Sequence, residues 1–180
     1  KYITEEYLYE RIVEGGSIAF ITSTAGWNWE KEAYRNELQP IIESRGWDVS
    51  IEALNSLNQQ EKPGPLGYTM SKRALNYYIT SIAGKFAEKK VRVNGVLPAA
   101  TNTGLTDDFA IMSGGKENLM NSVGYADRLA ESREMAEPIV FINSNMASFI
   151  SGVLLNVDYG QFVQMTLGHI PNILDFELIN

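Results

Sequence analysis

Apolar and polar positions along the chain follow two periods, one typical of strands and one typical of helices. Short apolar runs predict buried strands at Ser17–Ile21, Val91–Leu97 and Val153–Val157. Helical spacing of apolar residues predicts helices over residues 1–16, 30–45, 50–58, 68–90 and 131–143. Because strands that alternate with helices pair in parallel, the pattern predicts an α/β layer fold with a parallel sheet.

The segments between these elements differ in composition. Residues 61–67 hold two prolines and two glycines, which predicts a loop, and residues 105–130 are mixed and rich in glycine, as in a mobile lid. The chain opens at Lys1 as if inside a helix, without a capping residue or a preceding strand. Three strands are few for such a sheet, so we expect further strands, the N-terminal part of the domain, to lie before Lys1.

Composition narrows the class of protein. The chain has 180 residues, 44% of them hydrophobic, which suits one domain over residues 1–180. The net charge of −7 without a long basic run argues against nucleic acid, and the apolar runs are too short to span a bilayer. Cysteine is absent, which excludes disulfides and suits a reducing, cytoplasmic location, and no cluster has the spacing of metal ligands.

Tyr68 and Lys72 stand four residues apart on the helix predicted over 68–90, so their side chains share one face. A tyrosine hydroxyl ordinarily has a pKa of about 10, and a nearby ammonium lowers it by favouring the phenolate. Such a pair can give a proton to a carbonyl or take one from an alcohol. The same spacing also occurs in ordinary exposed helical pairs. The surrounding segments must therefore show whether this pair is catalytic.

Two strand ends supply that context. Ser23 follows the strand Ser17–Ile21, and in open α/β sheets ligands bind at the carboxyl ends of strands, where a serine can donate to a substrate oxygen. Pro98 ends the next strand and opens a loop over residues 98–104. The simpler interpretations are a turn serine bonded to its own backbone and an ordinary strand-ending loop.

Four segments of the chain, in order, resemble motif blocks of the short-chain dehydrogenase/reductase family. The segments are GGSIAFITSTAG, YTMSKRAL, VRVNGVLPAATNT and FINSNMASFISGVLLNVDYG, which together span Gly15 to Gly160. The resemblance implies a Rossmann-like three-layer α/β/α fold and the interconversion of a ketone and a secondary alcohol with NAD(H) or NADP(H). It also implies a homodimer or homotetramer and a substrate lid over residues 104–130.

The resemblance assigns roles to individual residues. Tyr68 would be the catalytic acid/base, Lys72 would hold the nicotinamide ribose and lower the tyrosine pKa, and Ser23 would polarise the substrate carbonyl. The positions that it implies for cofactor binding are Tyr68, Lys72, Pro98, Ala99, Thr101 and Thr103. Ala99 departs from the family, which usually has glycine after the proline. The family's glycine-rich phosphate turn and its catalytic asparagine would precede Lys1.

An insertion over residues 27–67 separates Ser23 from Tyr68, as in the bacterial 3α-hydroxysteroid dehydrogenase/carbonyl reductase branch. This suggests a small hydrophobic ketone or hydroxysteroid as substrate. The tryptophans of the insertion, Trp27, Trp29 and Trp47, can line a pocket, form an interface or pack a core.

Two other functions compete with the dehydrogenase. An enoyl reductase of a related type needs a wider Tyr-to-Lys spacing, and Leu75 stands where that lysine would be. A degenerate family member acting as a non-catalytic binding or scaffold subunit is favoured by the truncation and by Ala99. It is disfavoured by the intact set of Ser23, Tyr68 and Lys72, which a scaffold does not need.

Overall fold

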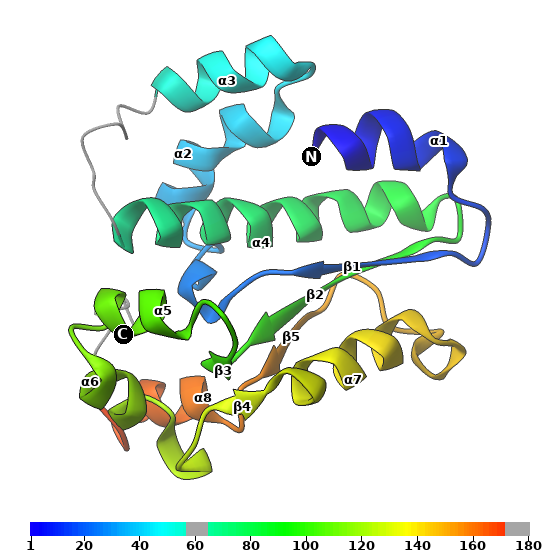
Figure 1. Cartoon of the computed structure of the whole chain (residues 1–180). Coiled ribbons are helices and arrows are strands. Elements are labelled where there is room, and N and C mark those ends of the chain that lie inside the picture. Colours follow the sequence, from blue (N-terminus) through cyan, green and yellow to red (C-terminus); the bar gives the residue numbers. More distant parts are fainter. Residues whose placement is uncertain (57–64, 172–180) are drawn as a thin grey trace.

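The computed structural model of the chain describes residues 1–56 and 65–171 (Figure 1). Within these ranges, three strands form a parallel sheet in the order β1-β2-β5, and a second parallel pair joins β3 to β4. The strands are β1 (Ser17–Ile21), β2 (Arg92–Pro98), β3 (Thr101–Asn102), β4 (Ala130–Glu131) and β5 (Leu154–Val157). The predicted α/β fold with a parallel sheet is confirmed, and the carboxyl ends of β1, β2 and β5 share one edge.

Helices cover both faces of the sheet, which confirms the three-layer arrangement (Figure 1). The long helix α4 (Pro65–Ala87) lies on one face and α7 (Ser132–Asn143) on the other. On the α4 side, the chain begins with a π-helix (Ile3–Leu8) that continues into α1 (Tyr9–Arg11), and α2 (Glu32–Glu43) and α3 (Trp47–Ser56) follow β1. No helix of the described ranges combines the length and the apolar character that a membrane crossing requires.

The core lies between α4 and the sheet. Ile79 and Phe86 of α4 and Val93 of β2 are completely buried, and the Phe86 ring meets the Tyr9 ring edge-on at 5.1 Å. Burying one such side chain contributes about 1.5–3 kcal/mol. This packing fixes α4 on the sheet and carries its N-terminal turns to the edge where the strands end (Figure 1).

The ends of α4 differ from the prediction of 68–90. The helix begins at Pro65, inside the predicted loop over 61–67, since proline suits the first helical position, where its missing N–H needs no partner. Residues 61–64 of that loop lie outside the described ranges. The helix stops at Ala87 because Lys90 turns left-handed, with φ of 59°, and leads directly into β2.

The first helix, by contrast, ends earlier than predicted. It stops at Arg11, because Ile12 is extended (ψ 130°), and Gly15 turns the chain toward β1. The apolar residues Ile12 and Val13 continue the helical spacing of the sequence without continuing the helix.

The segment over residues 104–130 contains more regular structure than its composition predicts. It folds into α5 (Thr106–Met112), α6 (Lys116–Asn121) and a 3₁₀ turn at Gly124–Ala126. After β5 the chain forms a further helix, α8 (Gln161–Thr166), in which Phe162 and Met165 are buried. The buried Asp158 holds the start of α8, since its carboxylate accepts from the N–H groups of Gly160 and Phe162, each at 3.0 Å.

Candidate active site

Ser23 follows β1 and lies at the edge of the sheet where the strands end. Ser23 is extended (φ −166°, ψ 152°) and precedes η2, the 3₁₀ turn at Thr24–Gly26. Its Oγ accepts a hydrogen bond from the N–H of Ala25 at 3.1 Å, so the simpler interpretation of a turn serine does describe this contact. Accepting a bond occupies a lone pair only, and the hydroxyl hydrogen remains able to donate to a substrate oxygen.

Gly26 brings this turn into direct contact with α4. A Cβ atom at Gly26 would lie 2.4 Å from the carbonyl oxygen of Lys72 and 2.5 Å from Nδ2 of Asn76. Only glycine leaves room for this approach, in which η2 packs against α4. The Ser23 turn is therefore seated on the stretch of α4 that carries Lys72.

Tyr68 and Lys72 lie on the first turns of α4. The Nζ atom of Lys72 is 5.5 Å from the centre of the Tyr68 ring, and burial lowers the pKa of the Lys72 ammonium. Tyr68 is half-buried, and its ring meets Phe109 of α5 edge-on, with ring centres 5.9 Å apart. The two side chains are thus partly covered, unlike those of an ordinary exposed helical pair.

Two further polar residues of this neighbourhood, Thr22 and Asn76, were not predicted from the sequence. Asn76, 1% exposed, accepts a hydrogen bond from Thr22 Oγ1 at 2.6 Å through its Oδ1. Its Nδ2 donates to the carbonyl oxygen of Ser23 at 3.4 Å. The one available signal was an asparagine among the apolar positions of the helix, such as Leu75 and Ile79.

The loop after β2 holds the other positions that the resemblance links to a cofactor. Pro98 ends β2 opposite Val157, and the N–H of Ala99 donates to the Val157 carbonyl at 2.9 Å. The Thr101 hydroxyl donates to the carbonyl of Ala99 at 2.8 Å, while Thr103 Oγ1 accepts from the N–H of Leu105 at 3.2 Å. Both threonines thus bind their own loop, and Thr103 keeps a hydroxyl hydrogen for another partner.

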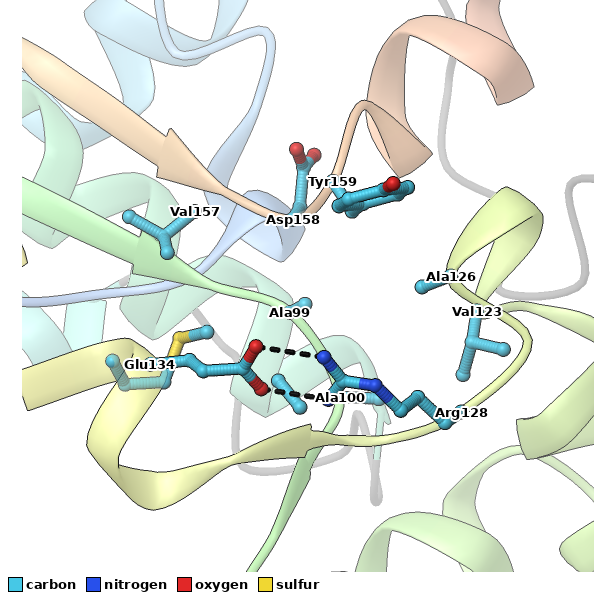
Figure 2. Close-up of a pocket in the computed structure, with 11 residues that line it drawn as sticks. Ala99, Ala100, Val123, Ala126, Arg128, Glu134, Val157, Asp158 and Tyr159 are labelled. Atoms are coloured by element: carbon cyan, nitrogen blue, oxygen red, sulfur yellow. Dashed lines mark hydrogen bonds and ion pairs between the residues drawn. The ribbon is translucent and has the colours of Figure 1, made fainter.

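A pocket of about 110 Å³ opens where β2 and β5 end (Figure 2). Its walls come from the loop after β2, the turn after β5, the 3₁₀ turn at 124–126 and the start of α7. The lining residues are Ala99, Ala100, Val123, Ala126, Arg128, Ala130, Glu134, Met135, Val157, Asp158 and Tyr159. Ala99 is the one predicted site residue in this lining, and Ser23, Tyr68 and Lys72 do not contribute to it.

The tryptophans of the insertion separate into two environments. Trp27 stacks on Phe162 of α8, with ring centres 4.2 Å apart, and Trp29 stacks on Tyr77 of α4 at 5.8 Å. Trp47 is 65% exposed on α3, beside a groove of about 210 Å³ against the first helix. Two of the three therefore pack the insertion onto the domain.

An ion pair on the rim of the pocket is held in a two-bond geometry. Arg128 donates to both carboxylate oxygens of Glu134, each at 2.7 Å, and Glu134 also accepts from the N–H of Glu131 at 2.8 Å (Figure 2). These bonds lower the pKa of Glu134 to about 2, and the hydrogen bonds from Arg128 are the largest cause of the shift. The pair therefore stabilises the fold at neutral pH, and this contribution is lost as pH falls from about 4.3, a usual glutamate value, through about 2.

Replacing Arg128 should remove the hydrogen bonds that keep the pKa of Glu134 low. We expect Arg128→Gln to raise the pKa of Glu134 toward its ordinary value, as followed by the pH dependence of its side-chain carboxyl resonance in NMR. Arg133→Gln is the matched control, because Arg133 pairs with Glu137 instead, at 2.6 Å. An unshifted Glu134 titration in Arg128→Gln would show that the two-bond pair does not hold the carboxylate in solution.

The chain resembles several known proteins. A family model described as Enoyl-(Acyl carrier protein) reductase matches residues 33–161, well over half of the chain. Short-chain dehydrogenase reductase 5 of Arabidopsis thaliana is 34% identical over 108 residues, which cover 56% of this chain and 39% of that protein. A 3alpha-hydroxysteroid dehydrogenase of Mediterraneibacter gnavus is 28% identical over 118 residues, covering 66% of this chain and 46% of that protein.

A solved structure agrees with these relatives. The 3-alpha-hydroxysteroid dehydrogenase from Pseudomonas sp. B-0831, complexed with NADH, matches with a TM-score of 0.68 and 25% identity, over 86% of this chain and 57% of that one. The chain spans less than half the length of the two curated relatives. The matched family model, these relatives and the shared parallel fold lead to one assignment: the chain belongs to the short-chain dehydrogenase/reductase family.

Proposed function

We propose that the protein is an oxidoreductase that interconverts a ketone and a secondary alcohol with NAD(H) or NADP(H). The observation that carries the proposal is the placement of the half-buried Lys72 ammonium beside the Tyr68 ring, on a stretch of α4 whose Lys72 backbone lies against the turn that bears Ser23. Solved relatives complexed with NADH or with bound NADP support the cofactor class. The Tyr-x-x-x-Lys spacing supports carbonyl over enoyl reduction.

The residues present fit a nicotinamide cofactor. No carboxylate of the described ranges forms a salt bridge with Lys72, and burial alone accounts for its lowered pKa. A half-buried cation that no carboxylate of residues 1–56 and 65–171 pairs with is suited to the hydroxyl oxygens of a ribose. When bound, the nicotinamide would supply or accept the hydride, and Lys72 with the loop at residues 98–103 would hold it.

The chain's own side chains would handle the proton. During reduction, the Tyr68 hydroxyl gives its proton to the ketone oxygen, and during oxidation the Tyr68 phenolate takes the proton of the alcohol. The Lys72 ammonium stabilises that phenolate. Ser23 donates a hydrogen bond to the same substrate oxygen, while Ala25 N–H fixes its Oγ. A binding or scaffold subunit would need none of these groups.

We further propose that the substrate is hydrophobic, with a 3α-hydroxysteroid as the first compound to test. The names of two relatives support this choice, since they are 3alpha- and 7alpha-hydroxysteroid dehydrogenases. Phe109 supports it too, because α5 sets an aromatic ring against Tyr68 and so gives the lid segment over residues 104–130 an apolar contact with the reacting end of α4. Homodimer or homotetramer formation and a cytoplasmic location belong to the same proposal.

Lys72→Met tests the function. The full-length protein should oxidise NADH or NADPH in the presence of a hydrophobic ketone, and Lys72→Met should lower kcat/KM by about 100-fold or more, because the phenolate loses its cation. Folding stability should not fall, since methionine fills the same space without the desolvation cost that lowers the Lys72 pKa.

Lys85→Met is the matched control for this experiment. Lys85 lies near the other end of α4, where its ammonium covers the Tyr9 ring at 4.3 Å, and its loss should leave turnover unchanged. Wild-type protein that turns over neither ketones nor alcohols with either nucleotide would contradict the proposed function. Equal losses in the two variants would contradict the role of Lys72.

A further inference from the structure

A buried hydrogen-bonded pair joins the end of β1 to the middle of α4. Thr22, 4% exposed, donates to Asn76, 1% exposed, over 2.6 Å, and we name these two residues the Thr22–Asn76 pair. Thr22 directly precedes Ser23, and Asn76 lies one helical turn after Lys72. Neither residue belongs to the reacting set proposed above.

The pair is in a position to set where Ser23 lies. Asn76 uses its Oδ1 for Thr22 and its Nδ2 for the Ser23 carbonyl, so a single amide holds two consecutive residues of the chain. Gly26, at the other end of the turn, lies in close contact with the Asn76 side chain and the Lys72 backbone. The location of Ser23 relative to α4 therefore depends on Asn76 at two points.

The same helix face carries the residues with which Ser23 must act. Tyr68, Lys72 and Asn76 follow one another at four-residue intervals, which places them along one side of α4. A shift of the Ser23 turn along or away from that side would change the separation between the serine and tyrosine hydroxyls. In a pre-organised site, a displacement of about 1 Å can cost about 100-fold in rate.

We propose that the Thr22–Asn76 pair positions the Ser23 hydroxyl relative to Tyr68 and Lys72. This inference rests on the proposed function and assigns both members as positioning residues, which act through Ser23 and do not touch substrate. Thr22 allows conservative substitutions that test it. Valine keeps the shape of threonine without the hydroxyl, and serine keeps the hydroxyl without the methyl group.

The first experiment compares these two variants in the full-length protein. Thr22→Val should lower kcat for ketone reduction about tenfold or more while the KM for the nucleotide stays unchanged, and Thr22→Ser should restore kcat. Thr80→Val is the matched control, because the Thr80 hydroxyl donates to carbonyls of its own helix, those of Asn76 and Tyr77. Wild-type kcat in Thr22→Val, or an equal loss in Thr80→Val, would overturn the inference.

The second experiment asks whether the pair acts through Ser23. Once Ser23→Ala has removed the hydroxyl, adding Thr22→Val should cause no further loss of kcat, whereas independent effects would multiply and overturn the inference. Absence of turnover in the wild type overturns the proposed function instead.

Hydrogen exchange gives a readout that needs no turnover. The amide of Ala25 bonds to Ser23 Oγ and should exchange faster in Thr22→Val than in Thr22→Ser. Equal exchange in the two variants would show that the hydroxyl does not hold the turn, and the inference would fall.

Discussion

Tyr68→Phe should abolish most of the proposed turnover, lowering kcat/KM for ketone reduction by about 100- to 10,000-fold. The substitution removes one hydroxyl, the group that would pass the proton, and leaves the ring in its edge-on contact with Phe109. We therefore expect the melting temperature and the affinity for the nucleotide to stay at wild-type values. Steady-state assays, thermal unfolding and nucleotide titration of the full-length protein together measure these three quantities.

Tyr77→Phe provides the control for this experiment. Tyr77 lies on the same helix, and its ring stacks on Trp29, a contact that phenylalanine can keep. Activity should survive in this variant. If Tyr68→Phe turned over ketones at the wild-type rate, proton transfer would have to come from another group, and the role proposed for the Tyr68 hydroxyl would be wrong.

The strands and the long helix were predictable because their patterns are local. β1 matches its predicted range of Ser17–Ile21, since a short apolar run between a glycine pair and a small-residue turn has few other solutions. α4 was predicted from the apolar spacing of Leu75, Ile79, Ile82 and Phe86, and the last three of these are core residues. Its first three residues were missed because Pro65 and Gly67 also fit a loop.

Short elements were less visible in the sequence. α5 and α6 have six or seven residues each, too few to show a clear apolar period between the glycines that flank them. β3 has two residues, and its partner β4 lies far along the chain. Such elements depend on tertiary contacts, which the pattern along the chain does not carry.

Some residues of the candidate site were likewise predictable from the sequence, and others were not. Ser23, Tyr68 and Lys72 were identified from spacing and from strand ends, both of which are readable along the chain. The Thr22–Asn76 pair was not, because its two members are 54 positions apart and one polar residue on an apolar helix face has many possible partners. The closeness of Gly26 to α4 was hidden for the same reason, since a glycine in a turn is usually explained by the turn itself.

Gly26→Ala is the substitution for which we expect the largest loss of stability, about 1–3 kcal/mol in the free energy of unfolding. The added methyl group would meet the carbonyl of Lys72 at 2.4 Å, and a helix backbone packed on the sheet cannot yield by that much. The turn must move away from α4, and Ser23 must move with it. We therefore expect kcat to fall as well, in the fraction of protein that remains folded.

A glycine-to-alanine change inside α4 should alter the free energy of unfolding in the opposite direction. Gly84 lies inside the helix, and a Cβ atom there would meet nothing within 4 Å, so Gly84→Ala should raise the free energy of unfolding by about 0.5–1 kcal/mol through its higher helix propensity. Urea unfolding measures the free energy of unfolding of Gly26→Ala and Gly84→Ala, which add the same methyl group at two different positions. If Gly26→Ala matched wild type in stability and turnover, the Ser23 turn would not be seated on α4, and the arrangement from which the catalytic roles are inferred would be lost.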